Sequence, residues 1–197
     1  MVYKTLEIVK DQLSQFLEIQ FSESDMAVLE NISKVDDNTV TTMDNKVVLT
    51  LVTLQEEAAL KNIPNVRLKN GKTEYRNTPV NAHIFVLVTA NRDTYQKSLA
   101  ALSSVAAYFQ HKKVFTNENS PISPTITTLS GITSFKFTVE LFSQTFEQHN
   151  HIWGALGGKS LPSILYKISI VSIEYDAVQG IGTPITEVLG TIHQIAP

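Results

Sequence analysis

Residues 153–160, WGALGGKS, contain residue types at a spacing that suggests a phosphate-binding site. A phosphate-binding P-loop reads G-x-x-x-x-G-K-[ST], because backbone N–H groups must surround the phosphates while the lysine neutralises their charge. Gly158, Lys159 and Ser160 match the end of this pattern. Its first glycine would have to be residue 153, which is Trp153, the one tryptophan of the sequence. The match to a P-loop is therefore partial.

The segments that flank this stretch also come in the wrong order for a P-loop, which connects a buried strand to a helix whose N-terminus faces the anion. Residues 143–153 have a helical pattern, and residues 161–175 have that of a strand opened by Pro162. We therefore interpret the stretch as a structural corner in which Gly157 or Gly158 ends the helix in a left-handed conformation. A small nucleotide- or phosphate-binding enzyme that uses this loop is the alternative function.

The other residues with chemical potential do not form a recognisable site. His149 and His151 lie about 200° apart on the predicted helix, which is unsuited to holding one metal ion. Glu56-Glu57 and Asp36-Asp37 are adjacent pairs rather than a spaced acid and base, and no serine stands in a G-x-S-x-G motif. The sequence has no cysteine, which excludes disulfides and thiolate chemistry. We expect no catalytic residue, no metal and no cofactor, and hence a protein that is not an enzyme.

Composition and charge indicate one globular domain. The chain has 197 residues, of which 43% are hydrophobic and 18% charged. The net charge is −3, with no long run of either sign, so we do not expect a nucleic-acid partner. Charged residues interrupt the N-terminal apolar pattern, which excludes a signal peptide, and together with the absence of cysteine this predicts synthesis in the cytoplasm. No apolar run approaches the roughly 18 residues that span a bilayer, so no membrane insertion is expected.

Two main helices are predicted from apolar residues at spacings of three and four. The first includes Leu6, Val9, Leu13 and Phe16. The second covers residues 92–110, with Asn91 or Asp93 as its N-cap, and its predicted buried face consists of Tyr95, Leu99, Leu102, Val105 and Phe109.

Four strands are predicted, at residues 46–54, 80–90, 133–141 and 163–175. The first two are apolar at nearly every position, which indicates burial on both faces. The third alternates, with Phe135, Phe137, Val139 and Leu141 on one face. Residues 22–39 are expected to form an irregular connection, and residues 64–79 a long exposed loop with a turn at Asn70-Gly71.

Together these patterns predict a single α+β domain at residues 1–175. Its central sheet would be mixed or antiparallel, with about four to five strands and the two main helices on one side. Residues 176–197 are expected to form an extended C-terminal arm, within which residues 185–195 have the composition of one further strand.

Three segments carry a resemblance to a known family: KVVLTLVTLQEEAALKNIPN, VNAHIFVLVTANRDTYQKSLAALSSVAAYFQ and FKFTVELFSQTFEQHNHIWGALGGKSLPSILYKISIV. The chain resembles the tail-terminator or cap family of extracellular contractile injection systems, which are phage-tail-like particles with an inner tube, a sheath and a baseplate. The resemblance covers residues 1–175, and its most specific part is WGALGGKSLPSILYK.

The resemblance implies a structural subunit of a hexameric ring, seated on the last layer of tube and sheath at the end away from the baseplate. Its partners would be further copies of itself, the inner tube and the sheath, in a particle that is cytoplasmic, membrane-anchored or released. Such a ring closes through head-to-tail contacts between its subunits. It requires neither catalytic residues nor a cofactor.

The candidate structural or subunit-interface residues all lie in or after the glycine-rich corner. Trp153 either fills the core of the monomer or anchors a subunit interface, and both alternatives are open from the sequence. Tyr166 and Lys167 lie on opposite faces of a strand, so Lys167 is expected to face a neighbour or solvent. The full set is Trp153, Gly154, Leu156, Gly157, Gly158, Pro162, Tyr166 and Lys167.

Overall fold

The computed structural model describes residues 1–37, 39–57, 66–69, 72–76, 80–121, 135–173 and 178–182. The helices of this part of the chain are α1 (Val2–Phe21), α2 (Tyr95–His111) and α3 (Phe146–Ala155), with a 3₁₀ turn, η1 (Ile32–Lys34). Its strands are β1 (Ala27–Leu29), β2 (Lys46–Glu56), β3 (Val66–Lys69), β4 (Lys72–Arg76), β5 (Val80–Asn91), β6 (Val114–Thr116), β7 (Lys136–Leu141), β8 (Ser163–Ile173) and β9 (Val178–Gly182).

The main sheet has six strands in the order β1-β2-β5-β8-β7-β6. β1 runs parallel to β2 and the other neighbours are antiparallel, so the predicted α+β fold with a mixed sheet is confirmed. The expected count of four to five strands was too low by one or two. β1 lies in residues 22–39, which were expected to be irregular, and β1 and β6 are each too short to show a sequence period.

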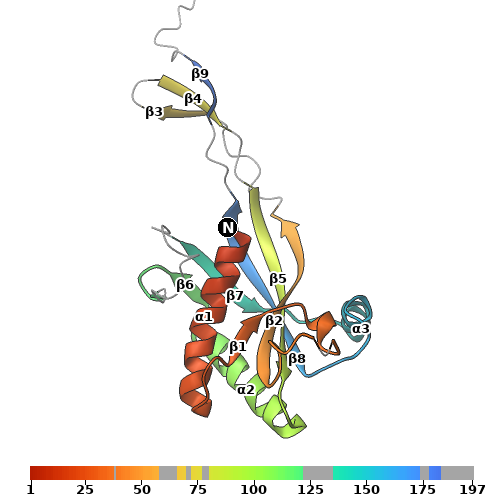
Figure 1. Ribbon diagram of the computed structural model, residues 1–197. Helices are drawn as coiled ribbons and strands as arrows, with labels where there is room; N and C mark the ends of the chain where they lie inside the picture. Colours follow the sequence, from red (N-terminus) through yellow and green to blue (C-terminus); the bar gives the residue numbers. More distant parts are fainter. Residues whose placement is uncertain are drawn as a thin grey trace, which may run out of the picture.

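Each face of the sheet carries its own hydrophobic core (Figure 1). On one face α1 and α2 pack against β2, β5, β7 and β8, and Leu13 and Leu17 of α1 are completely buried. Burial of each such leucine contributes roughly 1.5–3 kcal/mol. On the opposite face η1, the chain around Met43 and α3 cover Val48, Leu87 and Leu165. The two main helices therefore share one face as predicted, and α3 lies on the other.

The predicted buried face of α2 was partly wrong. Val105 and Phe109 are buried, whereas Tyr95 is 69% and Leu99 43% exposed. Small residues that the pattern did not weight, Ser98 and Ala101, are buried instead, because they let the helix approach its neighbours closely. The helix begins after Thr94, whose Oγ1 accepts a hydrogen bond from the backbone N–H of Lys97, rather than after Asn91 or Asp93.

A buried arginine connects three parts of the first core. Arg92, which is 9% exposed, donates from Nη2 to both carboxylate oxygens of Glu23 at 2.8 Å. Its Nη1 donates to the backbone carbonyl of Asn45 at 2.6 Å. Arg92 thereby ties the connection after α1 to the start of β2 and to the start of α2. Its charge is paired with Glu23, while its Nε atom has no hydrogen-bond partner among the described residues.

A second, three-stranded sheet has the order β3-β4-β9, with both pairs antiparallel. The prediction of a loop at residues 64–79 was therefore wrong for β3 and β4, whose polar composition concealed a hairpin. β9 lies near the start of residues 176–197, the segment that was expected to form an extended arm. Figure 1 shows this sheet projecting beyond the ends of β2 and β5. The turn at Asn70-Gly71 and the further strand at residues 185–195 lie outside the described residues.

The predicted apolar face of residues 133–141 differs from the observed burial at one position. Phe135, Phe137 and Val139 are buried as expected, but Leu141 is 64% exposed at the end of β7. No helix among the described residues is long and apolar enough to cross a membrane.

Candidate functional site

Helix α3 begins with a complete capping box. The Oγ1 atom of Thr145 accepts from the backbone N–H of Gln148 at 3.2 Å, and the side chain of Gln148 accepts from the backbone N–H of Thr145 at 3.0 Å. The two bonds satisfy backbone donors that the first turn of a helix leaves free. Thr145 is therefore the N-cap of α3, two residues into the segment 143–153 that was predicted to be helical.

The helix ends in the glycine turn that the sequence predicts. Gly157 and Gly158 have positive φ angles of 103° and 81°, and the backbone N–H of Gly158 donates to the carbonyl of Trp153 at 2.6 Å. This bond, from the second residue after the cap to the third residue before it, is the signature of a Schellman motif. Leu156 is the C-cap, and Gly154 lies inside the helix, where nothing stands within 4 Å of an added Cβ.

Trp153 belongs to the core of the monomer. It is 4% exposed and packs in the second core, with Leu156 and Leu161 partly buried around it. Its indole N–H has no hydrogen-bond partner among the described residues. Pro162 opens β8 as predicted, and its carbonyl accepts from the backbone N–H of Ala90, which joins the corner to β5.

The geometry of residues 153–160 does not suit a phosphate. The loop follows the C-terminus of α3, where the helix dipole is negative and repels anions. Lys159 pairs with Asp36 at 2.5 Å, and Ser160 lies 3.4 Å from the Nε2 atom of His149. The C-terminus of α3 offers the loop backbone carbonyls rather than N–H groups.

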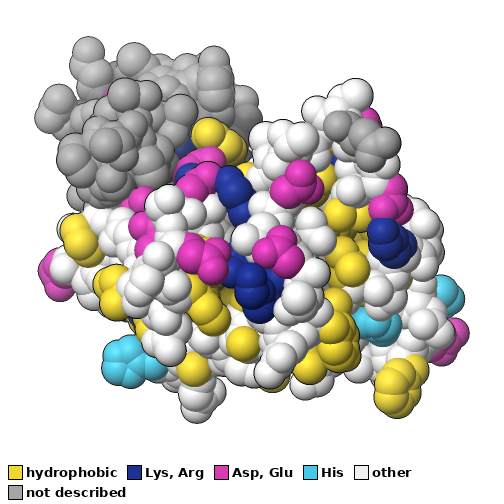
Figure 2. Space-filling view, turned by 60° about the horizontal axis from the view of Figure 1, so that its bottom comes forward, with side chains coloured by type: hydrophobic (Ala, Val, Ile, Leu, Met, Phe, Trp, Pro, Cys, Tyr) yellow, Lys and Arg dark blue, Asp and Glu magenta, His cyan; other side chains and the backbone are white. Residues whose placement is uncertain are grey.

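Histidines and carboxylates do not gather into a metal site in the described part of the chain. His149 and His151 both lie on α3 as predicted, and His149 contacts Gln144 through Nδ1 at 2.9 Å. In Figure 2, acidic and basic side chains lie beside one another on the face shown. Ion pairs among the described residues include Arg92 with Glu23 and Lys97 with Asp93.

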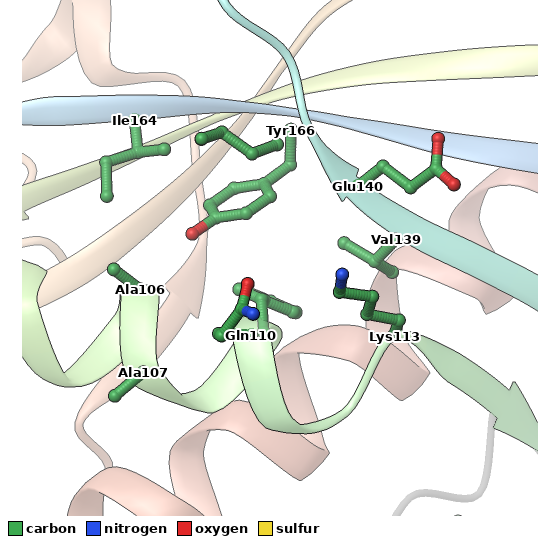
Figure 3. A pocket seen from close by; sticks show the side chains of 10 residues that line it. Ala106, Ala107, Gln110, Lys113, Val139, Glu140, Ile164 and Tyr166 are labelled. Atoms are coloured by element: carbon green, nitrogen blue, oxygen red, sulfur yellow. The ribbon is translucent and has the colours of Figure 1, made fainter.

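A cleft of about 830 Å³ lies between the end of α2 and strands β7 and β8 (Figure 3). Tyr166 is 3% exposed and its ring lies 4.5 Å from that of Phe109, while Lys167 on the other face of β8 is partly exposed. Burial raises the pKa of Tyr166 to about 12. The residues that line the cleft are Ala106, Ala107, Phe109, Gln110, Lys113, Val139, Glu140, Leu141, Ile164 and Tyr166.

This cleft was not predicted from the sequence. Its wall on α2 includes the small side chains of Ala106 and Ala107 beside Phe109 and Gln110, and its wall on β7 includes the exposed Leu141. Exposed alanines on a helix give no signal in a hydrophobic pattern. The arrangement offers an apolar surface with a few polar groups, which is suited to contact with another protein.

Comparisons with known proteins agree with this fold. The Pvc16 N-terminal domain family matches residues 5–187. The chain is similar to the PVC sheath/tube terminator of an extracellular contractile injection system in its extended state, with 16% identity and a TM-score of 0.63; the match covers 100% of this chain and 64% of that one. The tube-terminating cap of the anti-feeding prophage is also 16% identical, with a TM-score of 0.49 over 77% of this chain and 51% of the other. The chain thus spans less than two thirds of either. No curated protein sequence matches it.

Proposed function

Since this chain belongs to the Pvc16 N-terminal domain family, we propose that it is a structural subunit that terminates the tube and sheath of a contractile injection particle. The family predicted from the sequence is thereby confirmed. The observation that carries the proposed role is the family match over residues 5–187, together with a fold shared along the whole chain with a sheath/tube terminator.

In this proposal the chain assembles into a hexameric ring on the last layer of tube and sheath, at the end away from the baseplate. The contacts between subunits are head-to-tail and close by rotation. Apolar side chains that the monomer leaves exposed are available for such contacts. Among them are Ile19, which is 84% exposed, Phe146, which is 92% exposed, and Leu141 in the cleft. The partners are further copies of the chain, the inner tube and the sheath.

The proposal requires no catalytic residue and no cofactor. The alternative function, a phosphate-binding enzyme that uses residues 153–160, is disfavoured by the helix C-terminus at the loop and by the pairing of Lys159 with Asp36. Calorimetric titration with ATP and with inorganic phosphate separates the two functions. We expect no heat of binding for the wild type or for Lys159→Ala. Binding that the wild type shows and Lys159→Ala loses would favour the enzyme.

Electron microscopy of particles from cells with and without the gene tests the terminator role. We expect deletion to abolish the defined particle length or the sheathed particles altogether, and re-expression of the wild-type chain to restore both. Particles of normal number and unchanged length in the deletion strain would refute the proposed function.

A further inference from the structure

Half of strand β2 has an open edge in the part of the chain that the structure describes. β1 pairs with β2 only at Val47–Leu49, and the hydroxyl of Thr50 bonds to the backbone of Glu30 and Ile32. From Leu51 to Gln55, β2 pairs with β5 on one side, and no described strand pairs with the other side. An unpaired edge presents backbone N–H and C=O groups to which another strand can bond.

The side chains on this edge do not protect it. Folded proteins usually guard an exposed edge with lysine, proline or a twist that turns it away. Residues 51–55 are Leu-Val-Thr-Leu-Gln, without a charge or a proline, and the one irregularity is the register shift between Leu51 and Thr53. Leu51 and Leu54 are 44% and 41% exposed, which is unusual for two leucines on one strand of a core sheet. Such an edge is expected to be covered in the assembled protein.

A strand added to this edge would contact side chains of the protein on both faces of the sheet. Leu51 and Leu54 lie opposite Val86 and Ile84 of the first core, so they share the α1–α2 face of the sheet. On the other face a groove of about 340 Å³ runs from the edge to α3. Its floor is apolar, with Phe85 and Phe142 in edge-to-face contact at 5.0 Å, and its rim includes the side chains of Thr53, Gln55, Gln144 and Gln148. Main-chain bonds along an edge, with pockets for alternate side chains, constitute the β-augmentation mode of binding.

We propose that this edge binds residues 185–195 of a second copy of the chain as an added strand. The segment, ITEVLGTIHQI, is rich in β-branched residues and has one acidic residue, Glu187, and no lysine or arginine, so its composition suits an uncharged edge with two exposed leucines. An extended strand advances about 3.3 Å per residue, so this segment is long enough to cover Leu51–Gln55. The proposal rests on the proposed ring, which supplies the second copy.

The position of β9 favours a neighbouring copy over the chain's own edge. β9 pairs with β4 in the small sheet that projects beyond the ends of β2 and β5 (Figure 1). β9, which ends at Gly182, therefore lies outside the body of its own subunit. In a head-to-tail ring, an element that projects from one subunit toward its neighbour can reach that neighbour's sheet edge.

Cysteine cross-linking tests the strand exchange directly, because the natural sequence has no cysteine. One chain carries Thr53→Cys, an exposed position on the edge. A second, epitope-tagged chain carries a single cysteine at each position from 185 to 192 in turn. The two chains are mixed under ring-forming conditions and oxidised. We expect a tagged band of twice the chain mass for alternate positions of the segment. The control replaces Thr53→Cys by Leu99→Cys, which is similarly exposed on α2 and should give no such band.

A charge on the edge gives an independent measurement. Leu51→Lys should weaken ring assembly by roughly tenfold or more, since a strand could pair there only by covering the lysine. Leu99→Lys, with the same change at 43% exposure, should assemble like the wild type. Both positions are on the surface, so both variants are expected to fold.

The outcomes separate this inference from the proposed function. Rings that form without a cross-link at any position, and that tolerate Leu51→Lys, overturn the strand exchange and leave the ring standing. A cross-link that forms only when both cysteines are in one chain also overturns it. A wild-type chain that stays monomeric at all concentrations counts against the proposed ring itself.

Discussion

The glycine corner after α3 makes a quantitative prediction in which two neighbouring glycines respond with opposite signs. Gly157 has a φ of 103°, and an added Cβ would meet nothing closer than the backbone oxygen of Ser33 at 4.0 Å. Its replacement by alanine is therefore opposed by backbone conformation rather than by a steric clash, at about 1–2 kcal/mol. Gly154 lies inside α3 with open space around its Cβ position, where alanine is more favourable than glycine by about 1 kcal/mol.

Thermal unfolding, followed by circular dichroism on the two variants and the wild type, measures this difference. For a domain of this size, 1 kcal/mol shifts Tm by about 2–4 °C. We therefore expect Gly157→Ala to lower Tm by roughly 2–8 °C and Gly154→Ala to raise it by roughly 2–4 °C. The wild type and Gly154→Ala should have the same helical signal.

Two results would refute the reasoning. A Gly157→Ala variant as stable as the wild type would mean that the left-handed turn is not required. A Gly154→Ala variant that loses as much stability as Gly157→Ala would mean that the helix needs close packing at this position within the monomer. If Gly154→Ala is more stable than the wild type yet fails to form rings, the glycine instead serves a subunit contact. This is the role for which the sequence made Gly154 a candidate.

Three further perturbations probe the cores. Arg92→Met should cost about 1.5–3 kcal/mol in denaturant unfolding because it removes charge-assisted hydrogen bonds to Glu23 and to the carbonyl of Asn45, whereas Lys97→Met, at an exposed pair, should cost less than about 1 kcal/mol. Trp153→Ala should cost about 3–5 kcal/mol through lost burial and a cavity, and Phe146→Ala on the same helix close to nothing, since that ring is 92% exposed. Because burial raises the pKa of Tyr166 to about 12, the native state favours the protonated phenol; this stability is complete below pH 10 and lost as the pH rises toward 12. Tyr166→Phe should reduce the fall in unfolding free energy between pH 9 and pH 12 by up to about 2–3 kcal/mol.

The elements that the sequence predicts well are the long ones. α1 and α3 extend over several helical turns, and β2 and β5 are long apolar runs, so their type follows from the pattern. The three-residue strands β1 and β6 have no period to read, and their formation depends on the long strands beside them. The β3–β4 hairpin is polar, and its strands are recognised only by their pairing with each other and with β9. These elements are set by tertiary contacts that a single sequence does not display.

The buried face of α2 shows the same limit at the level of side chains. A hydrophobic pattern ranks Tyr95 and Leu99 above Ser98 and Ala101, yet the structure buries the smaller pair. The distance between α2 and its neighbours decides this choice, because only small side chains fit where the backbones approach. The fate of Trp153 was open for a related reason, since both the monomer core and a subunit interface favour a large aromatic ring.

The role of the segment GGKS in this protein depends on which end of a helix it adjoins. At the N-terminus of a helix they would place free N–H groups around an anion; here they follow a C-terminus, and the N–H of Gly158 closes the last turn. The turn, the buried Trp153 and the start of β8 at Pro162 together fix α3 over the second core. α3 in turn forms one wall of the groove beside the open edge of β2. The corner thus does not have the geometry of a phosphate site. It positions the surface to which we propose that a neighbouring copy adds a strand.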